Sequence, residues 1–308
     1  MTATSPTVFV TGATGSQGSA VARQLRDIGW NVQATARNVD SPAAKELQAL
    51  GVEVTAGDWD NEAVLKAAIE GCSCLFLNLT PNIATFSSEV PYARRILAIA
   101  KSVGVKHVIY SSAMSVKNFE KGKYYDPNHI VCQAFGWKRE IEELVKGGGF
   151  DAWTILRGGF FMCNFLAPKV NMMYRDLVRT NKWTTAYTSD ARMPMMDVED
   201  LAKFAVAAFQ DPGRFNEQTI EIASEKLSPD EIMQQLEEAT ERPMSSVFLT
   251  QKQIEEKLGS DLFVFVQLMS RDLGDKVDVE SVKSWGIPVG TFKNFLQREH
   301  ESLESTYA

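Results

Sequence analysis

The feature that most constrains this chain is a glycine-rich turn that directly follows its first apolar strand. The segment VTGATGSQGSAVARQL places Gly12, Gly15 and Gly18 three residues apart, between a predicted strand at 7–11 and an amphipathic helix. In such a unit the first glycine permits a tight turn, the second lets the backbone approach a pyrophosphate, and the third lets the helix pack on the strand. A purely structural turn is the alternative interpretation.

The start of this helix is the predicted phosphate-binding element. Ser16 and Gln17 lie where free N–H groups and the helix dipole attract an anion, and Thr14 precedes them. Because the motif stands at the head of an α/β pattern, we favour dinucleotide binding over the structural turn. The residues expected to bind the cofactor here are Gly12, Thr14, Gly15, Ser16, Gln17 and Gly18.

Short runs rich in Val, Ile and Phe alternate with segments of helical periodicity along the first half of the chain. Strands are expected at 7–11, 31–36, 52–56, 73–79, 106–111 and 151–157. Such an alternation predicts an α/β fold with a Rossmann-type doubly wound parallel sheet, whose ligands bind at the carboxyl ends of the strands. We expect a further strand near 184–188, and only helices and loops from residue 226 onward.

The ends of the next strands carry polar side chains. The second strand ends in TARN, where an NAD-selective site has Asp or Glu for the ribose 2′-hydroxyl. Arg37 instead predicts a charge-assisted contact with a 2′-phosphate, and hence NADP(H) in preference to NAD(H); a solvated arginine is the alternative. Asp58 could accept from the adenine amino group, and Asn78 and Thr80 follow the fourth strand, although ordinary turns use the same residues.

The length of 308 residues suggests about two domains. We expect an NADP-binding Rossmann domain over 1–157, with 183–225 returning to it. A smaller, mainly helical C-terminal lobe for a substrate or partner is expected from 158–182 and 226–308.

Charge and composition exclude several classes of protein. The net charge of −7 opposes direct nucleic-acid binding, and no apolar run reaches the length of a membrane span. Four cysteines are too few for a disulfide framework in a chain of this length. We therefore expect a cytoplasmic protein without a membrane partner.

Several segments together resemble the NmrA-like family, an atypical branch of the short-chain dehydrogenase/reductase superfamily. They are TGATGSQG, TARN, GDWD, WTILRGGFFMCNF and MDVED at 196–200, and the resemblance covers most of the first 210 or so residues. It implies a Rossmann domain and a smaller carboxyl-terminal lobe. Some members of the family reduce small molecules, often in secondary metabolism, and others bind NADP(H) or NAD and report redox state to a transcription factor.

The resemblance also implies where a proton donor belongs. Relatives that transfer hydride commonly carry Tyr-x-x-x-Lys on the helix after the fifth strand. Here that helix reads IVCQAFGWKREIEELV, with Lys138 at the lysine position and Ala134 at the tyrosine position. We therefore expect Lys138 to hold the nicotinamide ribose and to act as acid or base through a water, as in isoflavone-reductase-like relatives.

Neighbouring hydroxyl groups are further candidates for catalysis. Ser111 or Ser112, at the end of the fifth strand, could orient a carbonyl oxygen, with a strand-end turn as the alternative. Tyr110 could supply a displaced phenol. Tyr124, Tyr125 and His129 are further candidates for the missing donor, with a surface residue as the alternative for His129. The histidines share no ligand spacing with the cysteines, so we expect no metal site.

The segment after the sixth strand is rich in aromatic and thioether side chains. Phe160, Phe161, Met162, Asn164 and Phe165 lie beyond a strand end on the ligand edge, and we expect them to line an apolar substrate pocket. Core packing is the alternative for such a run.

Three functions remain open at this point. The first is an NADPH-dependent reductase of an apolar carbonyl or enone of the secondary-metabolite type. The second is a non-catalytic NADP(H) redox sensor that binds a regulatory protein partner, with access to the nucleus, which the loss of the tyrosine favours. The third is an isomerase or dehydratase on the same fold.

Overall fold

The structure is a computed structural model that describes residues 5–80, 87–271 and 277–308. It divides into two compact units. The first comprises Met1–Val116, Ala134–Arg157 and Leu201–Ile220, and the second comprises Lys117–Gln133, Gly158–Asp200 and Glu221–Ala308.

A seven-stranded sheet forms the centre of the first unit in the described residues, with the order β10-β6-β5-β4-β1-β2-β3. β1 pairs in parallel with both β2 and β4, β2 with β3, and β4 with β5. The expectation of a Rossmann-type doubly wound sheet is thus confirmed, and β10 is a strand that the sequence did not predict. The strands are β1 (Thr7–Val10), β2 (Asn31–Ala36), β3 (Glu53–Ala56), β4 (Cys74–Leu77), β5 (His107–Ala113), β6 (Ala152–Gly158) and β10 (Gln218–Ile222).

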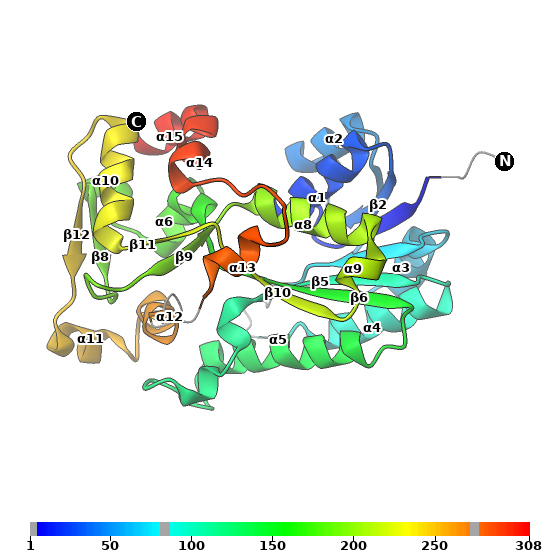
Figure 1. Ribbon diagram of the computed structural model, residues 1–308, viewed down its shortest axis with the longest axis horizontal. Coiled ribbons are helices and arrows are strands. Elements are labelled where there is room, and N and C mark those ends of the chain that lie inside the picture. Colours follow the sequence, from blue (N-terminus) through cyan, green and yellow to red (C-terminus); the bar gives the residue numbers. More distant parts are fainter. Residues whose placement is uncertain (1–4, 81–86, 272–276) are drawn as a thin grey trace. The chain divides into compact units, whose positions relative to one another are not determined.

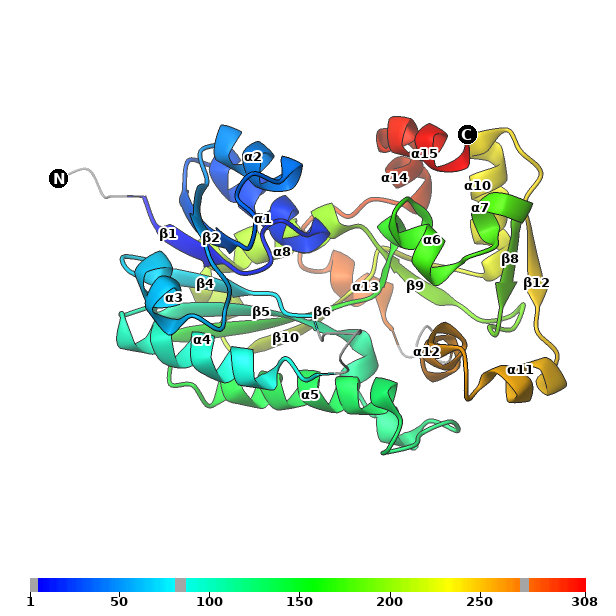
Figure 2. The same ribbon diagram turned by 180° about the vertical axis from the view of Figure 1, so that it is seen from behind.

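Helices cover both faces of this sheet. The helices are α1 (Ser16–Asp27), α2 (Pro42–Ala49), α3 (Glu62–Ile69), α4 (Val90–Ser102), α5 (Ile130–Lys146), α8 (Val198–Gln210) and α9 (Pro212–Phe215), with a 3₁₀ helix at Met114–Val116. α1, α2 and α8 lie over one face, and α3, α4 and α5 lie over the other (Figures 1 and 2). This division follows from the strand order, because right-handed crossovers that run in opposite directions from β1 place their helices on opposite faces. Buried apolar side chains such as Phe9, Leu75, Leu97 and Ile141 fill one of the two layers.

The second unit contains two small sheets and many short helices. Its strands are β7 (Phe160–Phe161), β8 (Lys182–Thr185), β9 (Met193–Met196), β11 (Glu225–Leu227) and β12 (Ser245–Phe248). Its helices are α6 (Lys169–Met173), α7 (Leu177–Thr180), α10 (Pro229–Thr240), α11 (Gln251–Lys257), α12 (Leu262–Ser270), α13 (Val279–Lys283), α14 (Phe292–Arg298) and α15 (His300–Tyr307), with 3₁₀ helices at Phe119–Lys121 and Met162–Phe165. Trp183, Phe165 and Phe292 are fully buried in its hydrophobic core.

Two sequence-based expectations differ from this structure. The prediction of only helices and loops from residue 226 onward is wrong, because β12 pairs in parallel with β8, Ser245 standing opposite Lys182. Of the segment 183–225, only Leu201–Ile220 lies in the first unit. Residues before it remain in the second unit because β8 pairs with β12 and β9 pairs with β7 and β11.

Candidate functional site

The glycine-rich turn joins β1 to α1 in a conformation that depends on its glycines. Gly12 has φ +63°, the left-handed region that glycine adopts most readily. At Gly18 a Cβ atom would lie 2.2 Å from the carbonyl oxygen of Gly12, so α1 packs directly against the turn. At Gly15 an added Cβ would meet only the Gly12 oxygen, at 3.3 Å, which leaves the other side of the turn open.

The amino end of α1 presents backbone N–H groups without a side-chain cap. Its N-cap is the exposed Gly15, and its first turn contains no acidic residue. The positive end of the helix dipole is therefore free of a protein carboxylate. Ser16 and Gln17 are partly exposed here, and Thr14 is exposed in the turn before them. A pyrophosphate fits this cradle because it needs N–H donors and a backbone without Cβ atoms at the point of approach.

Thr11 fixes the turn to the neighbouring strand. Its hydroxyl donates to the carbonyl oxygens of Phe76 (3.2 Å) and Asn78 (3.0 Å) and accepts from the Asn78 N–H at 2.7 Å. The carboxyl ends of β1 and β4 are thus held side by side, with Asn78 partly exposed and Thr80 exposed beyond it.

Arg37 and Asp58 follow the ends of β2 and β3. Arg37 is exposed, and in the described residues its guanidinium has no hydrogen-bond or ion-pair partner, so it is available to an anionic ligand. Asp58 is also exposed, but its Oδ1 accepts from the N–H of Trp59 at 2.6 Å. Asp58 therefore takes part in the local turn that was the alternative interpretation for it.

Lys138 lies on α5, and its ammonium group is held at the end of β4. Nζ donates to the carbonyl oxygen of Leu79 at 3.3 Å and lies 3.3 Å from Oε1 of Glu89. The Glu89 side chain is fully buried, whereas that of Lys138 is 18% exposed. The buried carboxylate therefore fixes an ammonium group that still reaches the surface of the unit.

Sequence reasoning missed Glu89 entirely. It stands at the N-cap of α4, where a carboxylate is ordinary because it favours the helix dipole. Only the fold brings it to Lys138, and no local pattern could have shown the pair.

The serines at the end of β5 are engaged in hydrogen bonds. Ser111 Oγ donates to Oε1 of Gln17 at 2.5 Å, which links β5 to the start of α1. Ser112 Oγ donates to Oε1 of Glu142 at 2.6 Å. Because each hydroxyl proton is already used, neither serine can donate to a substrate carbonyl without losing this bond.

Glu142 is a second buried carboxylate that the sequence analysis did not single out. It accepts from Nε (2.9 Å) and Nη2 (2.7 Å) of Arg157 as well as from Ser112. It stands four residues after Lys138 on α5, so the two side chains share a helix face. That spacing could have indicated from the sequence that Glu142 lies near the predicted site.

Tyr110 is buried with no exposed surface, and its Oη lacks a hydrogen-bond partner among the described residues. Burial, together with the charges of Glu89 and Glu142, raises the pKa of its phenol well above the ordinary value. A phenol that cannot reach a substrate and holds its proton so tightly is a poor acid, so we do not carry Tyr110 into the proposed reaction.

The aromatic segment after β6 belongs to the second unit. Met162 and Phe165 are fully buried in its core, and Asn164 is 9% exposed. Phe160 and Phe161 are partly exposed. These two are therefore the members of the predicted substrate pocket whose rings remain accessible.

His129 stacks on Phe265, their ring centroids 3.4 Å apart, and burial lowers its pKa. In the described residues no group of His, Cys, Asp and Glu side chains is arranged to hold a metal ion. Within the same part of the chain, no helix is long and apolar enough to span a bilayer.

Comparison with known proteins decides the family. The model of the NmrA-like family matches residues 4–284 of this chain. The chain belongs to the NmrA-like family. The NAD(P)H azoreductase of Xenophilus azovorans is 30% identical over 251 residues, which covers 82% of this chain and 80% of the azoreductase.

Solved structures of family members and relatives share the fold. NmrA, a negative transcriptional regulator solved in complex with NADP, has a TM-score of 0.77 at 20% identity, with 98% of this chain and 97% of NmrA covered. NmrA has also been solved with NAD. The NADPH-dependent quinone oxidoreductase QOR2 of Escherichia coli, complexed with NADPH, has a TM-score of 0.73 at 19% identity, with 94% and 99% covered. At these identities the likeness shows the fold alone.

Proposed function

We propose that this protein is an NADPH-dependent reductase of an apolar carbonyl or enone of the secondary-metabolite type. The observation that carries the proposal is the ammonium group of Lys138, which Glu89 and Leu79 hold at the same strand edge as the glycine-rich turn. The similarity to an NAD(P)H azoreductase supports a reductase.

The residues of the first unit have separate roles in this proposal. The turn at Gly12, Gly15 and Gly18 and the amino end of α1 bind the pyrophosphate, and Arg37 binds the 2′-phosphate that distinguishes NADP(H). When bound, the nicotinamide supplies a hydride, two electrons and one proton, to the substrate carbon. Lys138 holds the ribose.

Lys138 also carries the proton that balances the reduction. As an ammonium group it donates, through a water, to the oxygen of the reduced carbonyl or to the α-carbon of the reduced enone, and it regains that proton from solvent. The partial exposure of its side chain supports this exchange. Ser112 keeps Glu142 hydrogen bonded.

The cellular setting of the proposal is the cytoplasm. All four cysteines are free thiols, which supports a reducing compartment.

The experiment is the loss of NADPH absorbance with a panel of ketones, quinones and enones. We expect turnover with at least one apolar member. We also expect Lys138→Met to lower kcat by at least about 100-fold, the usual size of one acid–base contribution, while NADPH still binds. Lys146→Met, at the carboxyl end of the same helix, is the matched control and should retain wild-type turnover. Turnover that survives Lys138→Met would contradict the role of Lys138.

The second candidate function is a redox sensor without catalysis. It is favoured by Ala134, which stands where hydride-transferring relatives carry tyrosine. Absence of turnover across the panel, together with NADPH-dependent binding of a regulatory protein, would establish the sensor and remove the reductase.

A further inference from the structure

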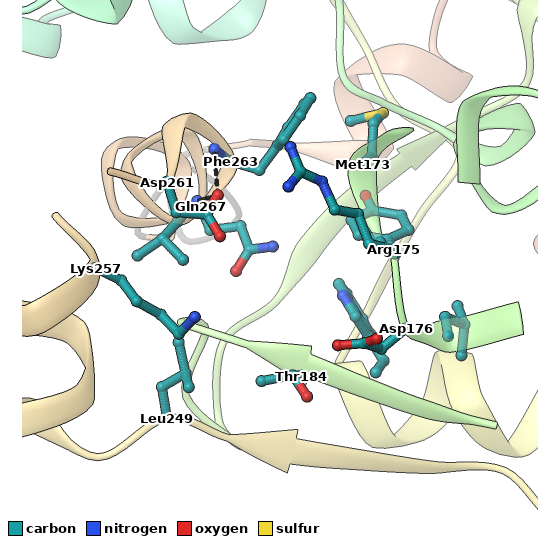
Figure 3. A pocket seen from close by; sticks show the side chains of 13 residues that line it. Met173, Arg175, Asp176, Thr184, Leu249, Lys257, Asp261, Phe263 and Gln267 are labelled. Atoms are coloured by element: carbon teal, nitrogen blue, oxygen red, sulfur yellow. Dashed lines mark hydrogen bonds between the residues drawn. The ribbon is translucent and has the colours of Figure 1, made fainter. Parts of the chain in front are cut away.

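The second unit contains a pocket of about 250 Å³. It lies between the segment joining α6 to α7, strand β8, and helices α11 and α12 (Figure 3). Its volume is slightly below the range of ~300–1,000 Å³ typical of small-molecule sites, so it suits a ligand of one or two rings. All of the residues that line it belong to the second unit.

The lining of the pocket combines apolar side chains with charged ones. Its apolar surface comes from side chains that remain partly exposed, namely Met173, Leu249 and Phe263. Arg175, Asp176 and Lys257 are exposed. A ligand that fits must therefore combine an apolar body with a polar end.

Gln267 supplies a directed hydrogen-bond donor to this pocket. The residue is only 6% exposed, and its Oε1 accepts from the N–H of Ala186 (2.7 Å) and the hydroxyl of Thr185 (3.0 Å). Because a backbone N–H can only donate, the contact with Ala186 fixes which end of the amide is oxygen. The Nε2 group has no hydrogen-bond partner among the described residues, and Figure 3 shows it directed into the pocket.

The charged side chains of the lining differ in how far the protein itself pairs them, each carboxylate being engaged through one oxygen. Oδ1 of Asp176 accepts from Nη2 of Arg179 at 2.7 Å, and Oδ1 of Asp261 accepts from the N–H groups at the start of α12. Arg175 and Lys257, by contrast, have no side-chain hydrogen bond or ion pair in the part of the chain that the structure describes. In the described residues the pocket therefore holds three donor groups without a protein acceptor, on Arg175, Lys257 and Gln267, and an anionic group of a ligand would satisfy them.

We propose that this pocket binds a small aromatic carboxylate or sulfonate. The ring of the ligand packs on the apolar side chains of Met173, Leu249 and Phe263, and its anionic oxygens accept hydrogen bonds from Gln267 Nε2 and Lys257. This site goes beyond the proposed reductase function: it requires no cofactor, and its test is made without one.

Calorimetric titration of the full chain with naphthoate, benzenesulfonate and the neutral isostere naphthamide tests the proposal. We expect naphthoate to bind at least about tenfold more tightly than naphthamide, since one charge-assisted hydrogen bond contributes that much. Equal affinities for naphthoate and naphthamide would overturn the proposal. It would also be overturned if none of the three probes bound with a Kd below about 10 mM.

Variants locate the ligand within the pocket. Gln267→Glu retains the acceptor for Ala186 but replaces the donor with a negative charge, so naphthoate affinity should fall at least about tenfold. Lys257→Met should lower it about threefold to tenfold. Lys252→Met, an exposed change on the same helix and outside the pocket, should leave it unchanged. If Gln267→Glu melts at a lower temperature, the exposed Lys257→Met carries the test alone. Wild-type affinity in both pocket variants would place the ligand elsewhere and refute the site.

Discussion

Replacing Lys138 by methionine should destabilise the protein far more than removal of a typical lysine. Glu89 is fully buried, and in the described residues neither of its carboxylate oxygens has a hydrogen-bond donor, so the ammonium group 3.3 Å away is its compensation. Breaking a buried ion pair by removing one partner costs about 3–5 kcal/mol. With an unfolding entropy of about 2.1 cal/mol/K per residue, this corresponds to a fall in Tm of about 5–8 °C for a chain of 308 residues.

The double variant Glu89→Leu/Lys138→Met separates this effect from loss of the lysine itself. Removing both charges leaves no uncompensated ion, and such replacements are often close to neutral in stability. The double variant should therefore melt above Lys138→Met. Lys146→Met breaks only a surface pair with Glu143, worth about 0–1 kcal/mol, and should melt close to the wild type.

Differential scanning calorimetry of the four proteins measures these differences directly. A Lys138→Met variant that melts like the wild type, or a double variant less stable than Lys138→Met, would show that Glu89 does not depend on Lys138. The double variant also serves the activity assay, because it restores the fold without restoring the ammonium group.

Two further predictions follow from burial and close packing. Gly18→Ala places a Cβ 2.2 Å from the Gly12 oxygen and should lower the free energy of unfolding by about 1–3 kcal/mol. Gly15→Ala should melt near the wild type but bind the cofactor more weakly. Equal melting temperatures of the two variants would contradict the packing role of Gly18. Burial lowers the pKa of His107 to about 4. The unfolded state, with a pKa near 6.5, therefore takes up the proton first, and about 3 kcal/mol of stability is lost as the pH falls from about 6.5 to 4. Urea denaturation at pH 7 and pH 4.5 should show a smaller loss for His107→Leu than for the wild type, while the exposed His300→Leu should lose as much as the wild type; an unchanged loss in His107→Leu would refute this.

The first six strands and the glycine-rich turn were readable from the sequence because their signals are local. Apolar runs of four to seven residues between helical segments mark buried parallel strands, and glycine spacing marks the turn. β10 was missed because its sequence, QTIEI, is short and half exposed. It also follows two helices, α8 and α9, so it stands outside the regular alternation of strand and helix in the first half of the chain. β12, with the sequence SSVF, has no apolar run, and it forms only because β8 lies beside it.

The polar network was less predictable than the fold. Lys138 was assigned through a family resemblance, whereas its buried partner Glu89 comes from a different helix start. Ser112 was expected to orient a substrate, yet its hydroxyl donates to Glu142. The Lys138–Glu89 pair and the Ser112–Glu142 hydrogen bond both join residues far apart in the sequence. Only the packed structure shows which hydroxyl and carboxylate groups already have a partner in the protein.

The most direct test of the account is a calorimetric titration of NADP⁺ and NAD⁺ into the wild type, Arg37→Ala and Lys66→Ala. We expect the wild type to bind NADP⁺ more tightly than NAD⁺. Arg37→Ala should weaken NADP⁺ binding about 10–100-fold with little change for NAD⁺, and the exposed Lys66→Ala should bind both like the wild type. Equal losses for both cofactors in Arg37→Ala, or a wild type that binds neither, would contradict it.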